Sequence, residues 1–193
     1  MFDPLKCAFL VIGCFFVTGI FQTLFLKSKF SESFAQSVDF GLHLGSQRLF
    51  GENKTFRGFV IMLPMVTLCF TLFGLWYTQS DSSFKEGFWA LELLGWTKLG
   101  FFSALGYTLG ELPNSFIKRR LGIPPGEQAT QPLMGKLFFI VDQLDSIVCA
   151  LLVIGWIVPT NLTFWVACLL IGAIAHYGFN VVLYWLGIKK RAA

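Results

Sequence analysis

Two acidic residues inside an apolar stretch are the side chains in this sequence that most need a chemical explanation. Asp142 and Asp145 lie in FFIVDQLDSIVC, and their spacing of three places both on one face of a helix. Two carboxylates so close repel each other unless a cation lies between them or one is protonated. Mg²⁺ favours carboxylate oxygens, so the pair indicates a metal or substrate site. An ion pair with Lys or Arg from a neighbouring segment is the alternative.

A second polar constellation follows one helical stripe in GELPNSFIKRRLGIPPG, residues 110–126. Glu111, Ser115 and Lys118 offer an acid, a hydroxyl and a cation at i, i+4 and i+7, which suits a metal–phosphate substrate. Pro113 is expected to bend or break the helix and to free backbone groups for a ligand. The side chains that flank the stripe are Asn114 and Arg119.

A third segment, FGENKTFRGF, is a basic loop bracketed by Gly51 and Gly58. Glycines let backbone amides approach a phosphate closely, although the loop lacks the Walker pattern. A role in setting membrane topology explains this loop equally well, and a stop-transfer role is the alternative for the cluster 118–120, above all for Arg120. The polar side chains of the loop are Asn53, Lys54, Thr55 and Arg57.

Apolar stretches must position these three segments. The chain has 193 residues, of which 55% are hydrophobic and only 13% charged, whereas soluble domains carry about 25% charged residues. A membrane helix needs about 20 mostly apolar residues. We therefore predict an all-α polytopic membrane protein, a single domain over residues 1–193 with about five transmembrane helices. The expected spans are 7–26, 58–76, 99–117, 137–157 and 162–186.

Other features of the apolar stretches lead to further expectations. The first stretch is longer than a signal-peptide core of about 7–15 residues, so we expect a retained span. The five Cys residues lie in apolar runs without a CxxC pair and are expected to be small buried hydrophobes. His176 and Asn180 are expected to make an interhelical hydrogen bond, and Gly106 and Gly110 to pack closely within or between subunits.

The distribution of basic residues predicts the orientation. Twelve of the 15 Lys and Arg residues follow the first, third and fifth spans. The positive-inside rule then places the N-terminus outside and the C-terminus in the cytoplasm, with segments 27–57 and 118–136 on the cytoplasmic side. Basic clusters beside spans indicate topology signals or contacts with lipid headgroups, and no nucleic acid partner is expected.

Together the three segments resemble the CTP:lipid-phosphate cytidylyltransferases, most of all the short CDP-archaeol synthase branch and its bacterial relatives. Ser115, Lys118 and Arg119 match the S-x-x-K-R part of the longer enzymes' signature, and the acidic pair matches its D-x-x-D end. The K-D and H-G-G elements are absent, as in the short branch.

At two further positions the sequence is similar to the motifs of this branch but has a different residue. GENKTFRG is similar to the branch's K-T-W-R-G motif, with Phe56 in place of Trp. Glu111 stands where the archaeal enzymes usually have Asp, which keeps the charge but lengthens its reach.

The resemblance implies transfer of a cytidylyl group from CTP to a membrane lipid phosphate, either an archaeal-type ether lipid phosphate or phosphatidate. The site would lie at the cytoplasmic face of the cell membrane and depend on one or two Mg²⁺ ions held by Asp142, Asp145 and Glu111. Lys118 would act with the two Asp residues in catalysis. The side chains expected to bind phosphates or nucleotide are Asn53, Lys54, Thr55, Arg57, Asn114, Ser115, Lys118 and Arg119.

Other functions stay open at this point. A small cation-coupled transporter would use the same acids, but it predicts more polar residues along the first, second and fifth spans. A non-catalytic membrane scaffold would use the charges for topology and packing. A CDP-alcohol phosphotransferase would need a denser Asp-rich motif. Membrane lipids are the surrounding partner in every case, and a homodimer is possible.

Overall fold

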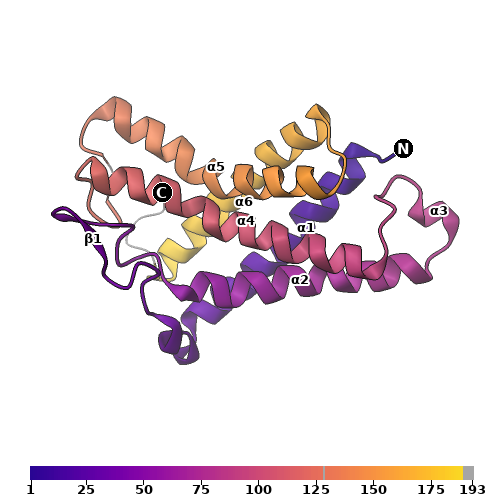
Figure 1. Ribbon diagram of the computed structural model, residues 1–193, viewed down its shortest axis with the longest axis horizontal. Coiled ribbons are helices and arrows are strands. Elements are labelled where there is room, and N and C mark those ends of the chain that lie inside the picture. Colours follow the sequence, from indigo (N-terminus) through magenta and orange to yellow (C-terminus); the bar gives the residue numbers. More distant parts are fainter. Residues whose placement is uncertain (128, 189–193) are drawn as a thin grey trace.

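Long helices make up most of the chain, as the computed structural model of residues 1–127 and 129–188 shows (Figure 1). A short 3₁₀ helix and a small hairpin lie between the first two long helices. The elements in order are α1 (Pro4–Lys27), η1 (Lys29–Phe34), β1 (His43–Leu44), β2 (Gln47–Arg48), α2 (Phe56–Gln79), α3 (Ser82–Lys85), α4 (Leu93–Arg120), α5 (Pro132–Ile157) and α6 (Leu162–Trp185).

Four of the described helices, α1, α2, α5 and α6, are long and apolar enough to cross a membrane. They correspond to four of the five predicted spans. The predicted span 99–117 lies within α4, which has 28 residues but ends in a basic and acidic segment. The all-α membrane fold is thus confirmed. The number of five spans and the orientation stay predictions, and the basic residues 189–191 lie outside the described part.

Helix α4 is the centre of the bundle because it packs along both α2 and α5. Glycines allow both approaches. A Cβ on Gly100 would meet Phe70 Cβ of α2 at 2.8 Å, and one on Gly110 would meet Cys149 Cβ of α5 at 2.7 Å. Gly106 is similarly close to the α5 backbone, since a Cβ on it would lie 2.9 Å from the carbonyl oxygen of Cys149. The Gly106/Gly110 pair therefore packs within the chain.

Pro113 was expected to bend or break its helix, and the structure shows that it does not break it. Helix α4 continues through Pro113 to Arg120. Pro113 lies on an exposed face of the helix, where its ring does not press on a neighbouring helix. The polar residues that follow Pro113 are consequently held at fixed helical spacing.

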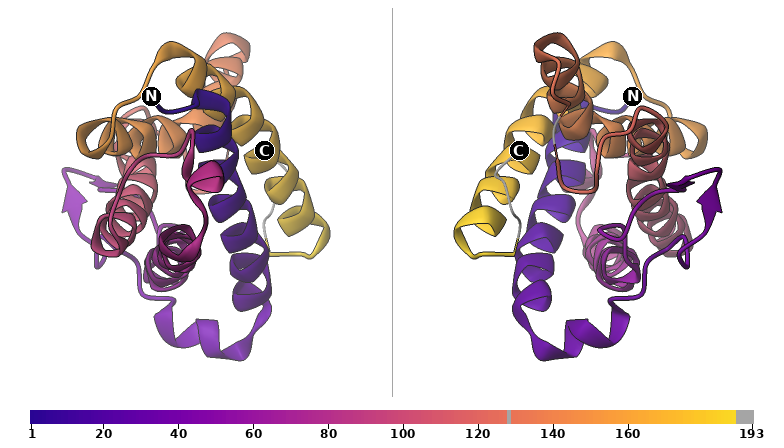
Figure 2. Two further views of the ribbon diagram at one scale, coloured as in Figure 1. Left: turned by 90° about the vertical axis from the view of Figure 1, so that its right-hand side faces the viewer. Right: turned by 90° about the vertical axis from the view of Figure 1, so that its left-hand side faces the viewer.

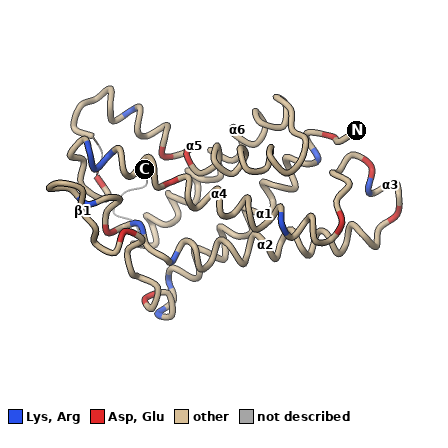
Figure 3. Tube along the Cα trace, in the orientation of Figure 1, with Lys and Arg blue, Asp and Glu red and all other residues tan. Residues whose placement is uncertain are grey.

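Apolar and charged residues occupy different parts of the molecule. The largest fully buried side chains include Trp96, Phe70 and Phe164, which pack near the α3 end. Large apolar side chains also cover the outside, as expected for contact with lipid. Basic residues gather at the opposite end, beside β1 (Figure 3). Helices α1 and α6 lie side by side along one flank (Figure 2).

Candidate active site

The two acidic residues of α5 face α4, where one amide nitrogen joins them. Asn114 Nδ2 donates to Asp142 Oδ1 at 2.6 Å and to Asp145 Oδ2 at 2.8 Å. Lys118 Nζ contacts both Asp142 oxygens at 2.6 Å, and the backbone N–H of Ser146 donates to Asp145 Oδ1 at 2.7 Å. The ion pair that the sequence left as an alternative is therefore present in this structure. It brings four predicted site residues into one network.

The basic loop reaches this network through a second ion pair. Lys54 Nζ contacts Glu111 Oε2, which links the loop before α2 to α4. Burial lowers the pKa of Lys54, but the Glu111 carboxylate, followed by Asp145 and Asp142, outweighs it and raises the pKa above its ordinary value. Lys54 therefore stays cationic at neutral pH, within the electrostatic reach of all three acids.

Arg119 lies in the last turn of α4 and is 5% exposed. Its Nε and Nη1 atoms are buried without a hydrogen-bond partner. A buried polar group without a partner is costly, so these donors are available to an anion. Ser115 is also buried on α4, one turn from Arg119. Both residues were predicted to bind phosphate, and the burial of the Arg119 guanidinium fits that expectation.

The other predicted residues of the basic loop differ from Lys54 in their exposure and contacts. Asn53 is exposed. Thr55 is the residue before α2, and its side chain makes no capping hydrogen bond. Arg57 Nε donates to the carbonyl of Ser31 at 3.0 Å, so it ties α2 to η1. The structure therefore brings Lys54 of this loop to the acids, and it gives Arg57 a structural contact.

Sequence reasoning missed Asp39, which organises the loop that carries Lys54. Its carboxylate is 2% exposed. It accepts from Gly41 N at 3.0 Å, Phe50 N at 3.2 Å, Gly51 N at 3.1 Å and Arg48 Nη2 at 2.6 Å. Burial raises the pKa of Asp39, but these donors outweigh it and hold the pKa well below its usual range. The sequence signal was the turn-forming D-F-G, which suggests only a local turn.

Arg120 holds the hairpin against α4. Its guanidinium donates to the carbonyls of Leu44, Gln47 and Arg48 at 2.7, 3.0 and 2.6 Å. The side chain thus has a structural contact that a stop-transfer role does not require. Through Arg120 and Asp39, the loop between α1 and α2 is fixed at the end of α4 where the acids lie.

The oxygen donors of the network fit a divalent cation. The three predicted metal ligands do not form a closed cluster, since in the described residues no group of three His, Cys, Asp or Glu side chains is close enough to hold a metal. Asn114 Oδ1, however, is buried without a partner. If the amide turned over, this oxygen would face the point that Nδ2 now shares with both Asp residues. Two carboxylates and an amide oxygen are ligands that Mg²⁺ accepts, with water and substrate phosphates completing its shell.

Comparison with known proteins decides the family. The profile of the CarS-like CDP-archaeol synthase family matches residues 30–192. The CDP-archaeol synthase of Saccharolobus solfataricus is 32% identical over 157 residues, which cover 79% of each chain. That of Thermofilum pendens is 35% identical over 156 residues, covering 79% of this chain and 63% of the relative. The chain belongs to the CDP-archaeol synthase family.

The fold agrees with membership of the CDP-archaeol synthase family. The solved structure of an intramembrane enzyme for archaeal membrane lipid biosynthesis superposes with a TM-score of 0.63 at 21% identity, covering 93% of this chain and 96% of that one. The resemblance inferred from the three polar segments is thereby confirmed. The protein is an integral membrane cytidylyltransferase of this family, whose reaction is CTP-dependent transfer to a lipid phosphate.

Proposed function

We propose that this protein transfers a cytidylyl group from CTP to an archaeal-type ether lipid phosphate or phosphatidate at the cytoplasmic membrane face, with Mg²⁺ as cofactor. An oxygen of the lipid phosphate attacks the α-phosphorus of CTP. One phosphorus–oxygen bond forms, the bond between the α-phosphorus and the bridging oxygen breaks, and pyrophosphate leaves. The products are a CDP-lipid and pyrophosphate.

The observation that carries the proposal is that acids and cations from three segments are paired along the same part of α4. Asn114 and Lys118 of α4 contact the Asp142/Asp145 pair of α5, and Lys54 of the loop contacts Glu111. Both reactants are anions, so positioning and charge neutralisation are the main requirements of the reaction. A network of this composition supplies both.

Roles for the residues follow from their contacts. Lys118, Lys54 and Arg119 would bind phosphates, since each is a cation within or beside the network. Ser115, Asn53 and Thr55 would add hydrogen bonds, and Arg57 a further cation if it left Ser31.

Asp142 and Asp145 would hold the Mg²⁺, with the Asn114 oxygen beside them. Glu111 would join as a third carboxylate only when Lys54 turns to a phosphate. When bound, Mg²⁺ would neutralise phosphate charge and polarise the α-phosphorus.

The cytoplasmic assignment rests on charge. The site lies at the end of the bundle where the basic residues gather (Figure 3), and cytoplasmic loops of membrane proteins carry an excess of Lys and Arg. CTP is a cytoplasmic metabolite in every cell, so a site on that side has access to its nucleotide.

Turnover with purified protein tests the proposal. The detergent-solubilised protein is given CTP and Mg²⁺ with either phosphatidate or an unsaturated ether-lipid phosphate, and CDP-lipid is measured by mass spectrometry. We expect product with at least one of the lipids and none without Mg²⁺. A folded preparation that makes no product from either lipid would contradict the proposal, and cation flux in liposomes without CTP would favour a transporter instead.

A further inference from the structure

The turn of α5 that carries the acidic pair is held by two neighbouring helices. On one side, Asn114 of α4 donates to Asp142 and Asp145. On the other, Gln143 faces α6, and its Oε1 accepts from Asn180 Nδ2 at 3.3 Å. Gln143 lies between the two acids in the chain. An amide of α4 and an amide of α6 therefore contact the same turn of α5, and the interhelical hydrogen bond expected of Asn180 is present.

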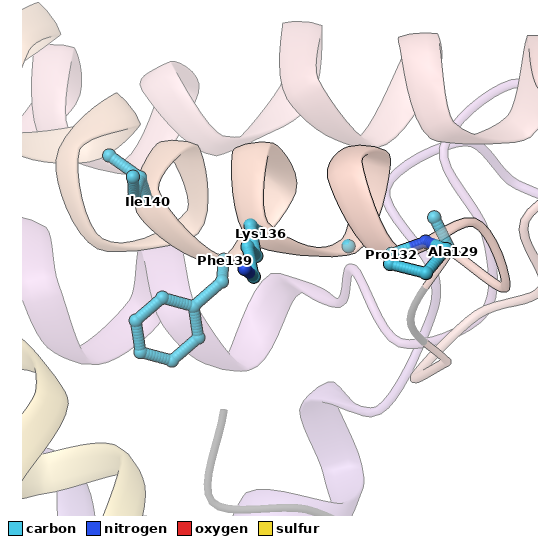
Figure 4. Close-up of a pocket in the computed structure, with 6 residues that line it drawn as sticks. Ala129, Pro132, Lys136, Phe139 and Ile140 are labelled. Atoms are coloured by element: carbon cyan, nitrogen blue, oxygen red, sulfur yellow. The ribbon is translucent and has the colours of Figure 1, made fainter.

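The hydrogen bond between Gln143 and Asn180 lies close to the open end of α5. Toward β1, helices α5 and α6 diverge (Figures 1 and 2), and a groove of about 660 Å³ runs along residues 129–140 (Figure 4). The Phe139 and Tyr177 rings, 6.0 Å apart, lie at the surface, since they are 39% and 44% exposed. Gln143 and Asn180 are both 6% exposed, so theirs is a buried contact beside this open end.

Stability alone does not explain an amide at position 143. The distance of 3.3 Å to Asn180 Nδ2 is beyond the range of about 2.7–3.2 Å for most N–H···O bonds. The Nε2 atom of Gln143 is buried without a hydrogen-bond partner, and a buried donor without an acceptor is destabilising. An apolar side chain of similar shape would fill the same space without this cost. The place of Gln143 between the two acids suggests another reason for the amide.

A small rotation of α5 about its own axis would displace both acids. Since helical side chains extend about 5–6 Å from the axis, a rotation of about 10° moves their ends by about 1 Å. A displacement of about 1 Å in reacting groups can cost about a hundredfold in rate. Helix α4 fixes one face of α5, where a Cβ on Gly110 would lie 2.9 Å from the carbonyl oxygen of Asp145. Gln143 lies about 100° around the helix from Asp142, so its contact with α6 opposes rotation from a second face.

We propose that Gln143 and Asn180 are positioning residues for cytidylyl transfer, an inference that rests on the proposed function. Their hydrogen bond fixes the rotation of α5, so that Asp142 and Asp145 keep the geometry in which Asn114 joins them. Both amides act through the acids and neither touches the reacting atoms. Helix α6, which contributes no residue to the predicted site, thereby takes part in the reaction.

Steady-state kinetics of Gln143→Met test the positioning role. We expect kcat at saturating CTP and lipid phosphate to fall about tenfold, because the acids are displaced in the transition state, while both KM values stay within about twofold. The melting temperature in detergent should stay within about 3 °C of the wild type, since the variant also removes the unpaired Nε2. Asn180→Leu should lower kcat by a similar factor. The double variant should be no slower than the slower single variant, because each substitution breaks the same hydrogen bond.

An exchange of the two amides separates positioning from general packing. Gln143→Asn combined with Asn180→Gln keeps the summed length of the two side chains and one donor and one acceptor on each, so kcat should recover to within about threefold of the wild type. Tyr177→Leu is the matched control, since it removes the ring contact with Phe139 between the same helices, and its kcat should stay within about twofold. An unchanged kcat in Gln143→Met, an equal loss in Tyr177→Leu, or an exchange as slow as the single variants would overturn the positioning role. A wild type without any turnover would instead contradict the proposed function itself.

Discussion

Asn114 links the two acidic residues of α5, because its single amide nitrogen contacts a carboxylate oxygen of each. Its Nδ2 donates to Asp142 and Asp145, while its Oδ1 is buried without a partner. The amide therefore holds the two carboxylates together without neutralising them. A cation that binds between them gains two anionic oxygens that are already positioned, which lowers the cost of ordering its ligands.

Removing either charge of the pair should abolish most turnover. Asp142→Asn and Asp145→Asn keep the shape of the side chain but halve the negative charge available to a cation. We expect each to lower kcat at least about a hundredfold, the scale seen when a group that stabilises transition-state charge is lost. The measurement is CDP-lipid formation at saturating CTP and lipid. Asp81→Asn, an exposed acid near α3, is the control, and near-normal rates for both site variants would remove the metal role.

The charge of Lys54 should depend on Glu111. Burial lowers the pKa of Lys54, and Glu111 is the largest of the contributions that raise it. Because the net shift is upward, wild-type Lys54 keeps its proton well into the alkaline range. Glu111→Gln removes the main opposing charge, so the pKa of Lys54 should fall. We expect the alkaline limb of the kcat/KM profile for CTP to move to lower pH in this variant. An unmoved limb would show that Lys54 does not bind the nucleotide.

Some residues of the site could be predicted from the sequence, and others could not. The acidic pair, Glu111 and Lys118 were found because charged side chains in or beside apolar runs need a reason. Asp39 was not, since an acid in a polar loop is ordinarily solvated. Its role arises from three backbone N–H groups that come together only when residues 39–51 fold back on themselves. The pairing of Lys54 with Glu111, rather than with the Asp pair, was equally invisible to spacing.

At the scale of elements, the α4–α5 contact sets the geometry of the site. Gly110 lies one turn before Asn114, and a Cβ there would meet Cys149 Cβ, the carbonyl oxygen of Asp145 and Ser146 Cα at 3.0 Å or less. The close approach is therefore made at the acidic pair itself. Any side chain at 110 must push α5 away from the residues that contact its carboxylates.

Gly110→Ala should consequently reduce activity more than stability. Overpacking costs about 1–3 kcal/mol, whereas a shift of about 1 Å in the reacting groups can cost about a hundredfold in rate. We expect kcat to fall at least about tenfold while the protein remains folded in detergent. Gly13→Ala is the matched control, since a Cβ at this glycine of α1 meets nothing within 4 Å. Equal effects of the two substitutions would contradict the role of close packing.

The loop between α1 and α2 should depend on the charge of Asp39. Its folded pKa is lowered, so its contribution to stability is present above the unfolded value of about 3.9 and is lost as pH falls toward the folded pKa. Asp39→Asn should free the loop at neutral pH, raise the KM for CTP several-fold and speed hydrogen exchange at Gly41 and Gly51. Exchange in α6 should stay unchanged. Slow exchange at both glycines in the variant would show that Asp39 is dispensable.

At the scale of the whole molecule, hydropathy predicted the helical layout because a membrane leaves few alternatives to helices. Four predicted spans agree with helices of sufficient length and hydropathy. The fifth predicted span, 99–117, lies within α4, which extends beyond it at both ends, from Leu93 to Arg120. Hydropathy could not indicate the extension past residue 117, since Lys118 contacts Asp142 of α5 and Arg120 contacts the hairpin of the loop, so contacts other than those with lipid hold these residues.

The orientation of the bundle is the remaining whole-molecule prediction, and cysteine labelling can test it. The five native Cys residues are buried or half-buried, so they should give little background with a membrane-impermeant maleimide. Ser82, in α3, and Ser46, between β1 and β2, are exposed near opposite ends of α2. If basic residues mark the cytoplasmic side, Ser82→Cys should label in intact cells and Ser46→Cys only after permeabilisation. The reverse pattern would place the acidic network outside, away from cytoplasmic CTP, and labelling of both in intact cells would show that α2 does not cross the membrane.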